Sequence, residues 1–319
     1  MTAPDPTTRG YDHVALCYAD DRELLASAVP FIAGGVERGD AVMIALEPAR
    51  AEVLLNAVDQ PDAVTVLAIG AQYARPAGAI KSYSDLFTKL VTDGAQAVRL
   101  IGELPAPVLA TAWDVWARYE AAVNYAFDRF PVSTLCAYDA RTTPPAVLDD
   151  VAKTHSLLAS PDGNHTPNPT YVDPPSFLAR TRPTTPHPVQ LRAPALELVD
   201  PAPGDARRAV VAANAGTLGP DALDDLVMSV SEIVTNALRY GLGPRRLRLW
   251  VGVGHLVVTV HDAGPGPADP FAGLLPKAGH DGGGYGLWIA HQLCDHVTLD
   301  RDASGFTVRL TMGDPHQAV

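Results

Sequence analysis

Residues 231–241 read SEIVTNALRYG, and this stretch decides how the C-terminal part of the chain folds. It continues a helical pattern in which apolar residues recur every three or four positions from Leu223 to Leu238. Glu232 and Asn236 are four residues apart, so they are stacked neighbours on the polar side of this helix. An amide oxygen suits Mg²⁺, which prefers few protein ligands, and a nearby carboxylate can accept a hydroxyl proton during phosphoryl transfer.

Two glycine-rich stretches follow this helix. HDAGPG at 261–266 ends an expected strand at 256–262, where the Asp262 carboxylate can accept the exocyclic amine of adenine and glycines let the backbone approach the base. GGGYGL at 282–287 opens an expected helix, whose free backbone N–H groups can hold phosphates. Each pattern alone is common in solvated helices, turns and flexible loops. The three patterns in this order, on these elements, favour a nucleotide site.

Together the three stretches resemble the N, G1 and G2 boxes of the GHKL ATPase superfamily. The resemblance implies ATP and Mg²⁺ as cofactors, with Asn236 as the Mg²⁺ ligand, Glu232 as the general base and Asp262 as the adenine contact. Thr307 matches the late position from which that superfamily supports the adenine. The cofactor-binding residues implied in this way are Asn236, Asp262, Gly264, Gly266, Gly282, Gly283, Gly284, Gly286, Leu287 and Thr307.

The segments before and between the three boxes help to decide which family of the GHKL superfamily this domain resembles. The expected helix at 205–218 has no histidine for a histidine kinase to phosphorylate, and the segment 267–282 is too short for a long lid. Residues 192–312 are similar to the anti-sigma factor serine kinases. This resemblance implies protein serine/threonine kinase activity, a sigma factor and a STAS-type anti-anti-sigma protein as partners, and a homodimer. Two alternatives remain open: a non-catalytic ATP-dependent switch that binds partners, and a degenerate histidine kinase-like ATPase.

The first half of the chain alternates apolar strands with helices. Helical spacing predicts helices between the strands, including a long one at 107–130 and a closing one at 145–158. This alternation predicts an α/β domain with a mainly parallel sheet covered on both faces, whose ligands bind beyond the carboxyl ends of the strands. The phosphate-loop pattern GxxxxGK[ST] is absent from the sequence, so this domain should not bind ATP in the usual way. The expected strands are 14–18, 41–46, 64–68, 98–101 and 133–138.

Short polar motifs occur along these strands and helices in a fixed order: YAR at 73–75, RLIGE at 99–103, RYEAAVN at 118–124, CAYD at 136–139 and TH at 154–155. Their order resembles that of the MEDS sensory domain over residues 10–178, which implies a RecA-like fold without a phosphate loop and a small organic molecule as the signal. The arginines and glutamates of these motifs fit a structural ion-pair network as well as they fit a sensing pocket. We expect His13 and His155 to be core histidines with ordinary hydrogen-bond partners rather than metal ligands, because no third ligand is near in sequence. The expected sensory pocket comprises Tyr73, Arg75, Arg99, Glu103, Tyr119, Glu120, Asn124 and His155.

Composition and charge predict the kind of partner and the location of the protein. The 319 residues carry a net charge of −12, which argues against direct nucleic-acid binding and fits a protein partner better. Three cysteines in apolar runs, no signal-like N-terminus and no long apolar run predict a cytoplasmic protein without a membrane span. We expect two domains, at residues 10–178 and 192–319, joined by a proline-rich linker at 179–191. We therefore expect a sensory domain that controls an anti-sigma-type ATPase domain.

Overall fold

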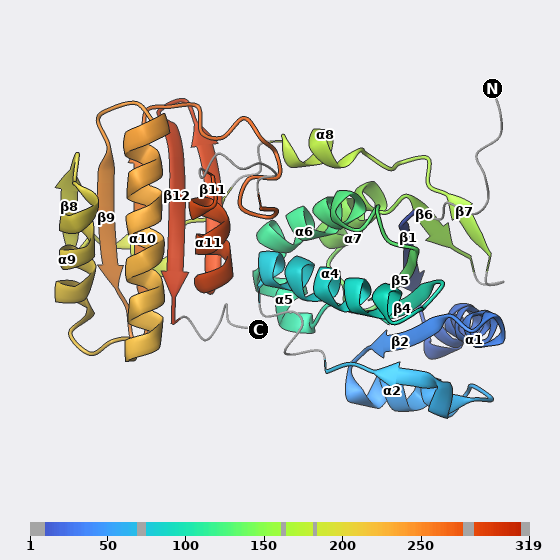
Figure 1. Cartoon of the computed structure of the whole chain (residues 1–319). Helices are drawn as coiled ribbons and strands as arrows, with labels where there is room; N and C mark the ends of the chain where they lie inside the picture. Colours follow the sequence, from blue (N-terminus) through green and yellow to red (C-terminus); the bar gives the residue numbers. More distant parts are fainter. Residues whose placement is uncertain (1–9, 69–74, 161–163, 181–183, 277–283, 314–319) are drawn as a thin grey trace, which may run out of the picture. The chain divides into compact units, whose positions relative to one another are not determined.

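The computed structural model describes residues 10–68, 75–160, 164–180, 184–276 and 284–313 (Figure 1). The chain forms two compact units: the first extends to Leu178, and the second follows it and also includes residues 75–78. The first unit is α/β with a mostly parallel sheet, and the second is α+β with an antiparallel sheet, as the sequence predicted. Within the described residues the first unit contains β1 (Asp12–Tyr18), α1 (Asp21–Arg38), β2 (Ala41–Ala45), α2 (Pro48–Leu55), a 3₁₀ turn η1 (Pro61–Ala63), β3 (Val64–Val66), α4 (Pro76–Thr92), β4 (Val98–Gly102), α5 (Ala106–Thr111), α6 (Trp113–Ala126), β5 (Val132–Asp139), α7 (Pro145–Thr154), β6 (Leu157–Ala159), β7 (His165–Pro167) and α8 (Pro174–Leu178).

The sheet of the first unit has the strand order β3-β2-β4-β5-β1-β6-β7, and only the pair β6–β7 is antiparallel. Helices α1 and α2 cover one face of this sheet, and α4, α6 and α7 cover the other (Figure 1). Successive residues of β1 therefore point to opposite sides. Val14 and Leu16 pack under α1 and α2, while His13 and Ala15 face α6 and α7.

Two expected helices of the first unit differ in the structure. The long helix predicted at 107–130 is two helices, because the backbone of Ala112 leaves the helical region with φ −122° and ψ 15°. The closing helix ends at Thr154 rather than at residue 158. His155 is extended there, and Leu157–Ala159 forms β6 beside β1, so pairing with the sheet edge replaces the last helical turn.

The second unit is a two-layer sandwich. Helices α9, α10 and α11 lie across one face of a sheet with the order β11-β12-β10-β9-β8 (Figure 1). The most buried residues of α10 and of the central strand β10 form the core between the layers. Within the described residues this unit contains a 3₁₀ turn η2 (Pro188–Leu191), β8 (Leu196–Val199), α9 (Pro203–Asn214), α10 (Pro220–Tyr240), β9 (Arg246–Val251), β10 (Leu256–Asp262), α11 (Gly286–Leu293), β11 (His296–Asp302) and β12 (Gly305–Met312).

The proline-rich stretch contains more regular structure than its composition predicts. Before the expected linker, the chain forms the edge hairpin β6–β7 and the helix α8. Residues 184–191 of the expected linker pack on the sheet face of the second unit that the three helices leave open, where Val189 is buried with Trp250 and Val257. None of the helices in the described ranges combines the length and apolar composition needed to cross a membrane.

Candidate functional site

Helix α10 positions the first two residues of the predicted nucleotide site. Ile233, Val234 and Ala237 are buried in the core between α10 and the sheet, which fixes the rotation of the helix about its axis. That rotation leaves Glu232 and Asn236 partly exposed on the side of α10 toward α11. The apolar stripe of α10 therefore determines where its polar pair is presented.

Gly286 brings the first turn of α11 against this polar pair. A Cβ atom added at Gly286 would lie 2.7 Å from Glu232 Oε2 and 3.0 Å from Asn236 Nδ2. A Cβ here would displace the Glu232 carboxylate and crowd the Asn236 amide, so glycine lets the first turn of α11 lie directly against these two side chains. Two residues earlier, Gly284 has φ 103°, in the region that glycine favours. Two of the three predicted boxes therefore meet at one place.

Asp262 joins them from the end of β10. Its carboxylate is buried, and Oδ1 accepts hydrogen bonds from the backbone N–H of Gly264 at 2.7 Å and of Leu242 at 3.2 Å. A Cβ at Gly241, just past the end of α10, would lie 2.4 Å from Asp262 Cγ. The carboxylate is thus held about one helical turn beyond Asn236, so all three boxes converge on the last two turns of α10.

The structure does not bring every predicted residue into this group. Asp262 pairs with Phe306 across β10 and β12, so Thr307 belongs to the opposite face of the sheet, where its hydroxyl is hydrogen-bonded to His261 Nδ1 at 3.0 Å. Leu287 is buried in the core of the second unit. Gly266 has φ 71°, in the left-handed region that glycine favours. Gly282 and Gly283 lie outside the described residues.

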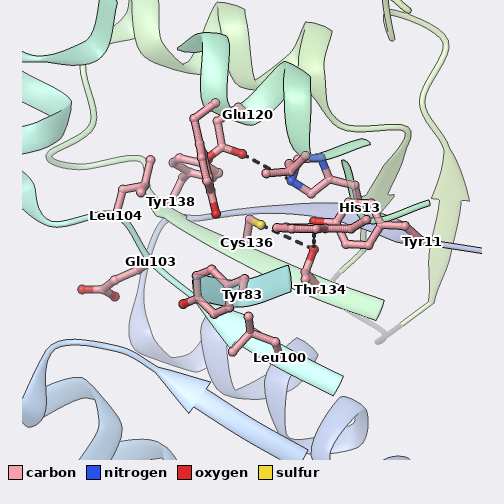
Figure 2. A pocket seen from close by; sticks show the side chains of 14 residues that line it. Tyr11, His13, Tyr83, Leu100, Glu103, Leu104, Glu120, Thr134, Cys136 and Tyr138 are labelled. Atoms are coloured by element: carbon pink, nitrogen blue, oxygen red, sulfur yellow. Dashed lines mark hydrogen bonds and ion pairs between the residues drawn. The ribbon is translucent and has the colours of Figure 1, made fainter. Parts of the chain in front are cut away.

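The first unit contains a cavity of about 30 Å³ between its sheet and α6 (Figure 2). This volume holds roughly two water molecules, so any organic ligand that fits without rearrangement has only a few heavy atoms. Glu103, Tyr119 and Glu120 line the cavity, as predicted for a sensory pocket. Tyr119 and Glu120 come from α6, and Glu103 follows the carboxyl end of β4.

Other predicted pocket residues take different positions. Arg99 lies near the amino end of β4, where its guanidinium donates to Asp40 at 2.9 Å and to the carbonyl oxygen of Phe31 at 2.7 Å. It is therefore part of a structural ion pair at the edge of the sheet away from Glu103. Arg75 is not among the residues that line the cavity, and Tyr73 lies outside the described residues.

Strand alternation supplies the lining residues that the sequence interpretation left out. Thr134, Cys136 and Tyr138 are alternate residues of β5, so they share one face of the sheet. Tyr11, just before β1, reaches the same face, where its hydroxyl is hydrogen-bonded to that of Thr134 at 2.8 Å. The signal in the sequence was the spacing of Thr134, Cys136 and Tyr138, which alternate with the aliphatic residues at 135 and 137.

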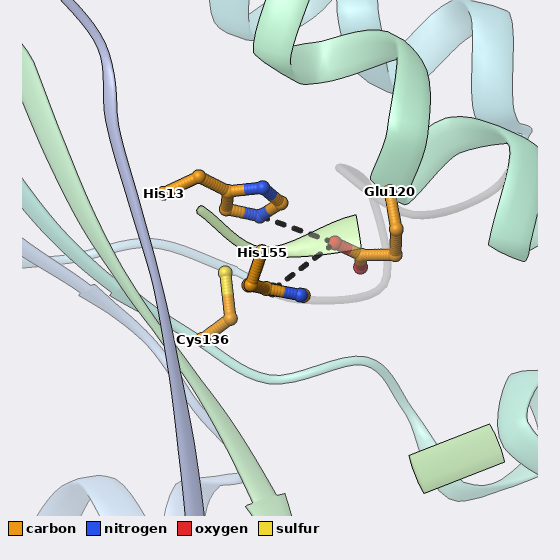
Figure 3. A group of neighbouring side chains, drawn as sticks. All are labelled: His13, Glu120, Cys136 and His155. Atoms are coloured by element: carbon orange, nitrogen blue, oxygen red, sulfur yellow. Dashed lines mark ion pairs between the residues drawn. The ribbon is translucent and has the colours of Figure 1, made fainter. Parts of the chain in front are cut away.

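A buried cluster borders the cavity. Glu120 Oε2 lies 3.3 Å from His13 Nε2 and 3.6 Å from His155 Nε2 (Figure 3). Asn124, one turn after Glu120 on α6, places its Oδ1 3.3 Å from His13 Nδ1. Burial lowers the pKa of each histidine from 6.5 to about 3, and burial raises the pKa of Glu120. Uncharged imidazoles are therefore favoured at neutral pH.

A second group of charges lies at the carboxyl edge of the same sheet. Arg50, on α2, donates to Glu103 Oε2, and its guanidinium is 3.9 Å from Asp139 Oδ2 at the end of β5. Burial raises the pKa of Glu103, while its pairing with Arg50 acts in the opposite direction. Hydrogen bonds from Arg141 lower the pKa of Asp139. One arginine therefore bridges two strand ends.

Comparisons with known proteins match two separate parts of the chain. The family described as "MEthanogen/methylotroph, DcmR Sensory domain" (MEDS) matches residues 12–156, and the family "Histidine kinase-like ATPase domain" matches residues 200–312.

Individual relatives cover parts of the chain. The transcriptional repressor DcmR of Methylorubrum extorquens is 28% identical over 156 residues, which are 46% of this chain and 58% of that protein. The chain thus matches a little over half the length of this relative. The NMR structure of the histidine kinase domain of the Escherichia coli osmosensor EnvZ is 20% identical, with a TM-score of 0.24, over 39% of this chain and 91% of that one. The two family matches identify the chain as a MEDS sensory domain, at residues 12–156, joined to a histidine kinase-like ATPase domain, at residues 200–312.

Proposed function

We propose that the chain is a cytoplasmic signalling regulator in which the MEDS domain controls an ATP- and Mg²⁺-binding anti-sigma factor domain. The observation that carries this proposal is the close approach of Gly286 to Glu232 and Asn236, beside the buried carboxylate of Asp262. This approach sets the N-terminus of α11, whose first backbone N–H groups are free to hold phosphates, beside an acid and an amide that can serve a bound Mg-nucleotide.

Each residue has a distinct role in this proposal. The Asn236 amide oxygen holds Mg²⁺, and the Asp262 carboxylate accepts the exocyclic amine of adenine. The Glu232 carboxylate accepts the proton of a serine hydroxyl on a STAS-type anti-anti-sigma protein. ATP supplies the phosphoryl group when it is bound. Gly264 and Leu242 hold Asp262 in place through their backbone N–H groups.

The signal reaches the regulator through the first unit. A cavity of about 30 Å³ suits a very small organic molecule. Because the relative DcmR is a transcriptional repressor, we place the output at transcription, through a sigma factor whose binding depends on the state of the ATPase domain. A homodimer is part of the proposal because kinases of this branch are commonly dimeric.

Calorimetric titration of the full chain with Mg-ATP tests the nucleotide site. We expect binding by the wild type and loss of Mg²⁺-dependent affinity in Asn236→Ala. Thr235→Ala is the matched control, because Thr235 is the exposed neighbour on the same helix and its hydroxyl bonds only to the preceding turn. No binding at millimolar ATP by the wild type would contradict the proposal.

Phosphoryl transfer from labelled ATP to a purified STAS-type protein then separates the candidate functions. Loss of transfer with retained ATP binding in Glu232→Gln supports the kinase. Nucleotide-dependent partner binding without transfer supports the non-catalytic switch. Acid-labile autophosphorylation of the chain itself would identify a histidine kinase-like activity and refute the anti-sigma assignment.

A further inference from the structure

We propose that His13, Glu120, Cys136 and His155 bind one transition-metal ion of the zinc class inside the MEDS domain. The four ligand atoms all lie within 4.8 Å of one another. They come from β1, α6, β5 and the residue after α7, so the fold rather than any local motif assembles them. Two imidazoles, a thiol and a carboxylate are the donors that zinc sites use.

Hydrogen bonding fixes the tautomer of His155. Its Nδ1 lies 3.0 Å from the carbonyl oxygen of Val151. Because a carbonyl oxygen only accepts, Nδ1 carries the proton, and Nε2 presents its lone pair toward Glu120. This is the arrangement of metal-binding histidines, whose second ring nitrogen donates to a backbone carbonyl or a carboxylate.

The tautomer of His13 is fixed in the same way. Asn124 uses its Nδ2 group to donate to the carbonyl oxygens of Thr154 at 2.8 Å and Glu120 at 3.0 Å. Its Oδ1 therefore faces His13 Nδ1, which must be the donor of that hydrogen bond. The His13 Nε2 lone pair then also points at Glu120 Oε2.

Three electron-rich atoms thus face a common point with nothing between them. Glu120 Oε2 and His155 Nε2 are buried and make no hydrogen bond within the described residues. Their separations of 3.3 and 3.6 Å match a tetrahedral site, since metal bonds of about 2.0–2.2 Å place neighbouring N and O ligands about 3.4 Å apart. Buried polar atoms normally have partners. The Tyr138 hydroxyl lies near Glu120 without a hydrogen bond of good geometry, and a cation at the common point would satisfy the carboxylate and both imidazoles together.

The surroundings favour a metal ion over a proton. A dication balances the Glu120 carboxylate and a Cys136 thiolate, so the buried site has no net charge. The Cys136 thiol contacts the Thr134 hydroxyl, with Sγ and Oγ1 3.8 Å apart. Both Cys136 and Glu120 also line the small cavity, which places the metal ion at its wall. This inference does not depend on the nucleotide site.

The test uses the full-length chain, stripped with a chelator and reloaded with Zn²⁺ or Co²⁺. We expect one metal ion per chain by elemental analysis. The Co²⁺ form should show visible bands of a tetrahedral site and a near-ultraviolet band from thiolate to cobalt. Cys136→Ser should lose the near-ultraviolet band, whereas Cys17→Ser, which removes the other cysteine of this unit, should keep it. Glu120→Gln should weaken Zn²⁺ binding at least about tenfold.

Several outcomes would overturn the proposal. One is a wild-type protein that binds no more Zn²⁺ than the variant His13→Gln/His155→Gln, with circular dichroism confirming that both are folded. Another is a cobalt spectrum that Cys136→Ser and Glu120→Gln leave unchanged. If the double variant does not fold, the near-ultraviolet bands of Cys136→Ser and Cys17→Ser still show whether Cys136 binds the metal ion. A folded wild type without any bound metal would mean that a proton is shared among these residues instead.

Discussion

Replacing Arg50 with glutamine tests how the carboxyl edge of the MEDS sheet is held together. Arg50 pairs with Glu103, which is 7% exposed, and lies 3.9 Å from Asp139. The variant therefore leaves a buried carboxylate without its cation. Breaking a fully buried pair costs about 3–5 kcal/mol. Because Arg50 is itself 27% exposed, water screens part of the interaction, and we expect a loss of about 2 kcal/mol at pH 7.

The loss should depend on pH in a defined direction. Burial already raises the pKa of Glu103 above 4.5, and removing Arg50 takes away the main influence that lowers it. A carboxyl group with a raised folded-state pKa contributes stability that is fully present below the unfolded pKa and is lost as the pH rises through the folded pKa. Arg50→Gln should therefore destabilise the unit less at pH 5 than at pH 7. Asp139, Tyr18 and Glu47 are the other titratable groups near this site.

The assay is urea denaturation of the full chain, followed by tryptophan fluorescence. In the background Trp250→Phe/Trp288→Phe only Trp113 and Trp116 remain, so the signal reports the first unit alone. The neutral replacement Glu103→Gln is the control.

Added to Arg50→Gln, Glu103→Gln should recover about half of the lost free energy and remove the pH dependence, because no buried charge remains. The reasoning would be refuted by an Arg50→Gln variant as stable as the wild type, or by a loss equal at pH 5 and pH 7.

Three further predictions concern the nucleotide and metal sites. Gly286→Ala should lower Mg-ATP affinity at least about tenfold in calorimetry, because the added Cβ meets Glu232, whereas Gly219→Ala, with open space around its Cβ, should leave affinity unchanged. Asp262→Asn should weaken ATP binding more than GTP binding in competition titrations, since it removes the anionic acceptor for the adenine amine; equal losses would contradict this role. Chelator treatment should lower the thermal midpoint of the first unit, and Zn²⁺ should restore it; an unchanged midpoint by differential scanning fluorimetry would argue against metal binding.

The residues expected at the nucleotide site are closer together in the structure than those expected at the sensory pocket. Glu232, Asn236 and Asp262 belong to short motifs whose order and element types are readable along the chain, and the structure brings those elements together at Gly286 and Gly241. Strand register is not readable in this way. The pairing of Asp262 with Phe306 puts Thr307 on the opposite face of the sheet.

The residues around the cavity come from distant positions. His13, Glu120, Cys136 and His155 are brought together only by parallel pairing of β1 with β5 and by the packing of α6 and α7 over that face. Arg99 was misplaced for a related reason: a strand motif does not show which end of the strand carries the ligand. It pairs with Asp40 at the amino edge.

The packing of residues 184–191 moves the start of the ATPase domain to residue 184 or earlier. Composition assigns this segment to a linker, yet Val189 is 5% exposed against Trp250 and Val257. Trp250 also donates through Nε1 to the carbonyl oxygen of Arg192 at 2.9 Å. A fragment that begins at residue 192 would therefore uncover an apolar patch on its sheet and tend to aggregate. An expression fragment of this domain should begin at or before residue 184, whatever the proline content of the segment.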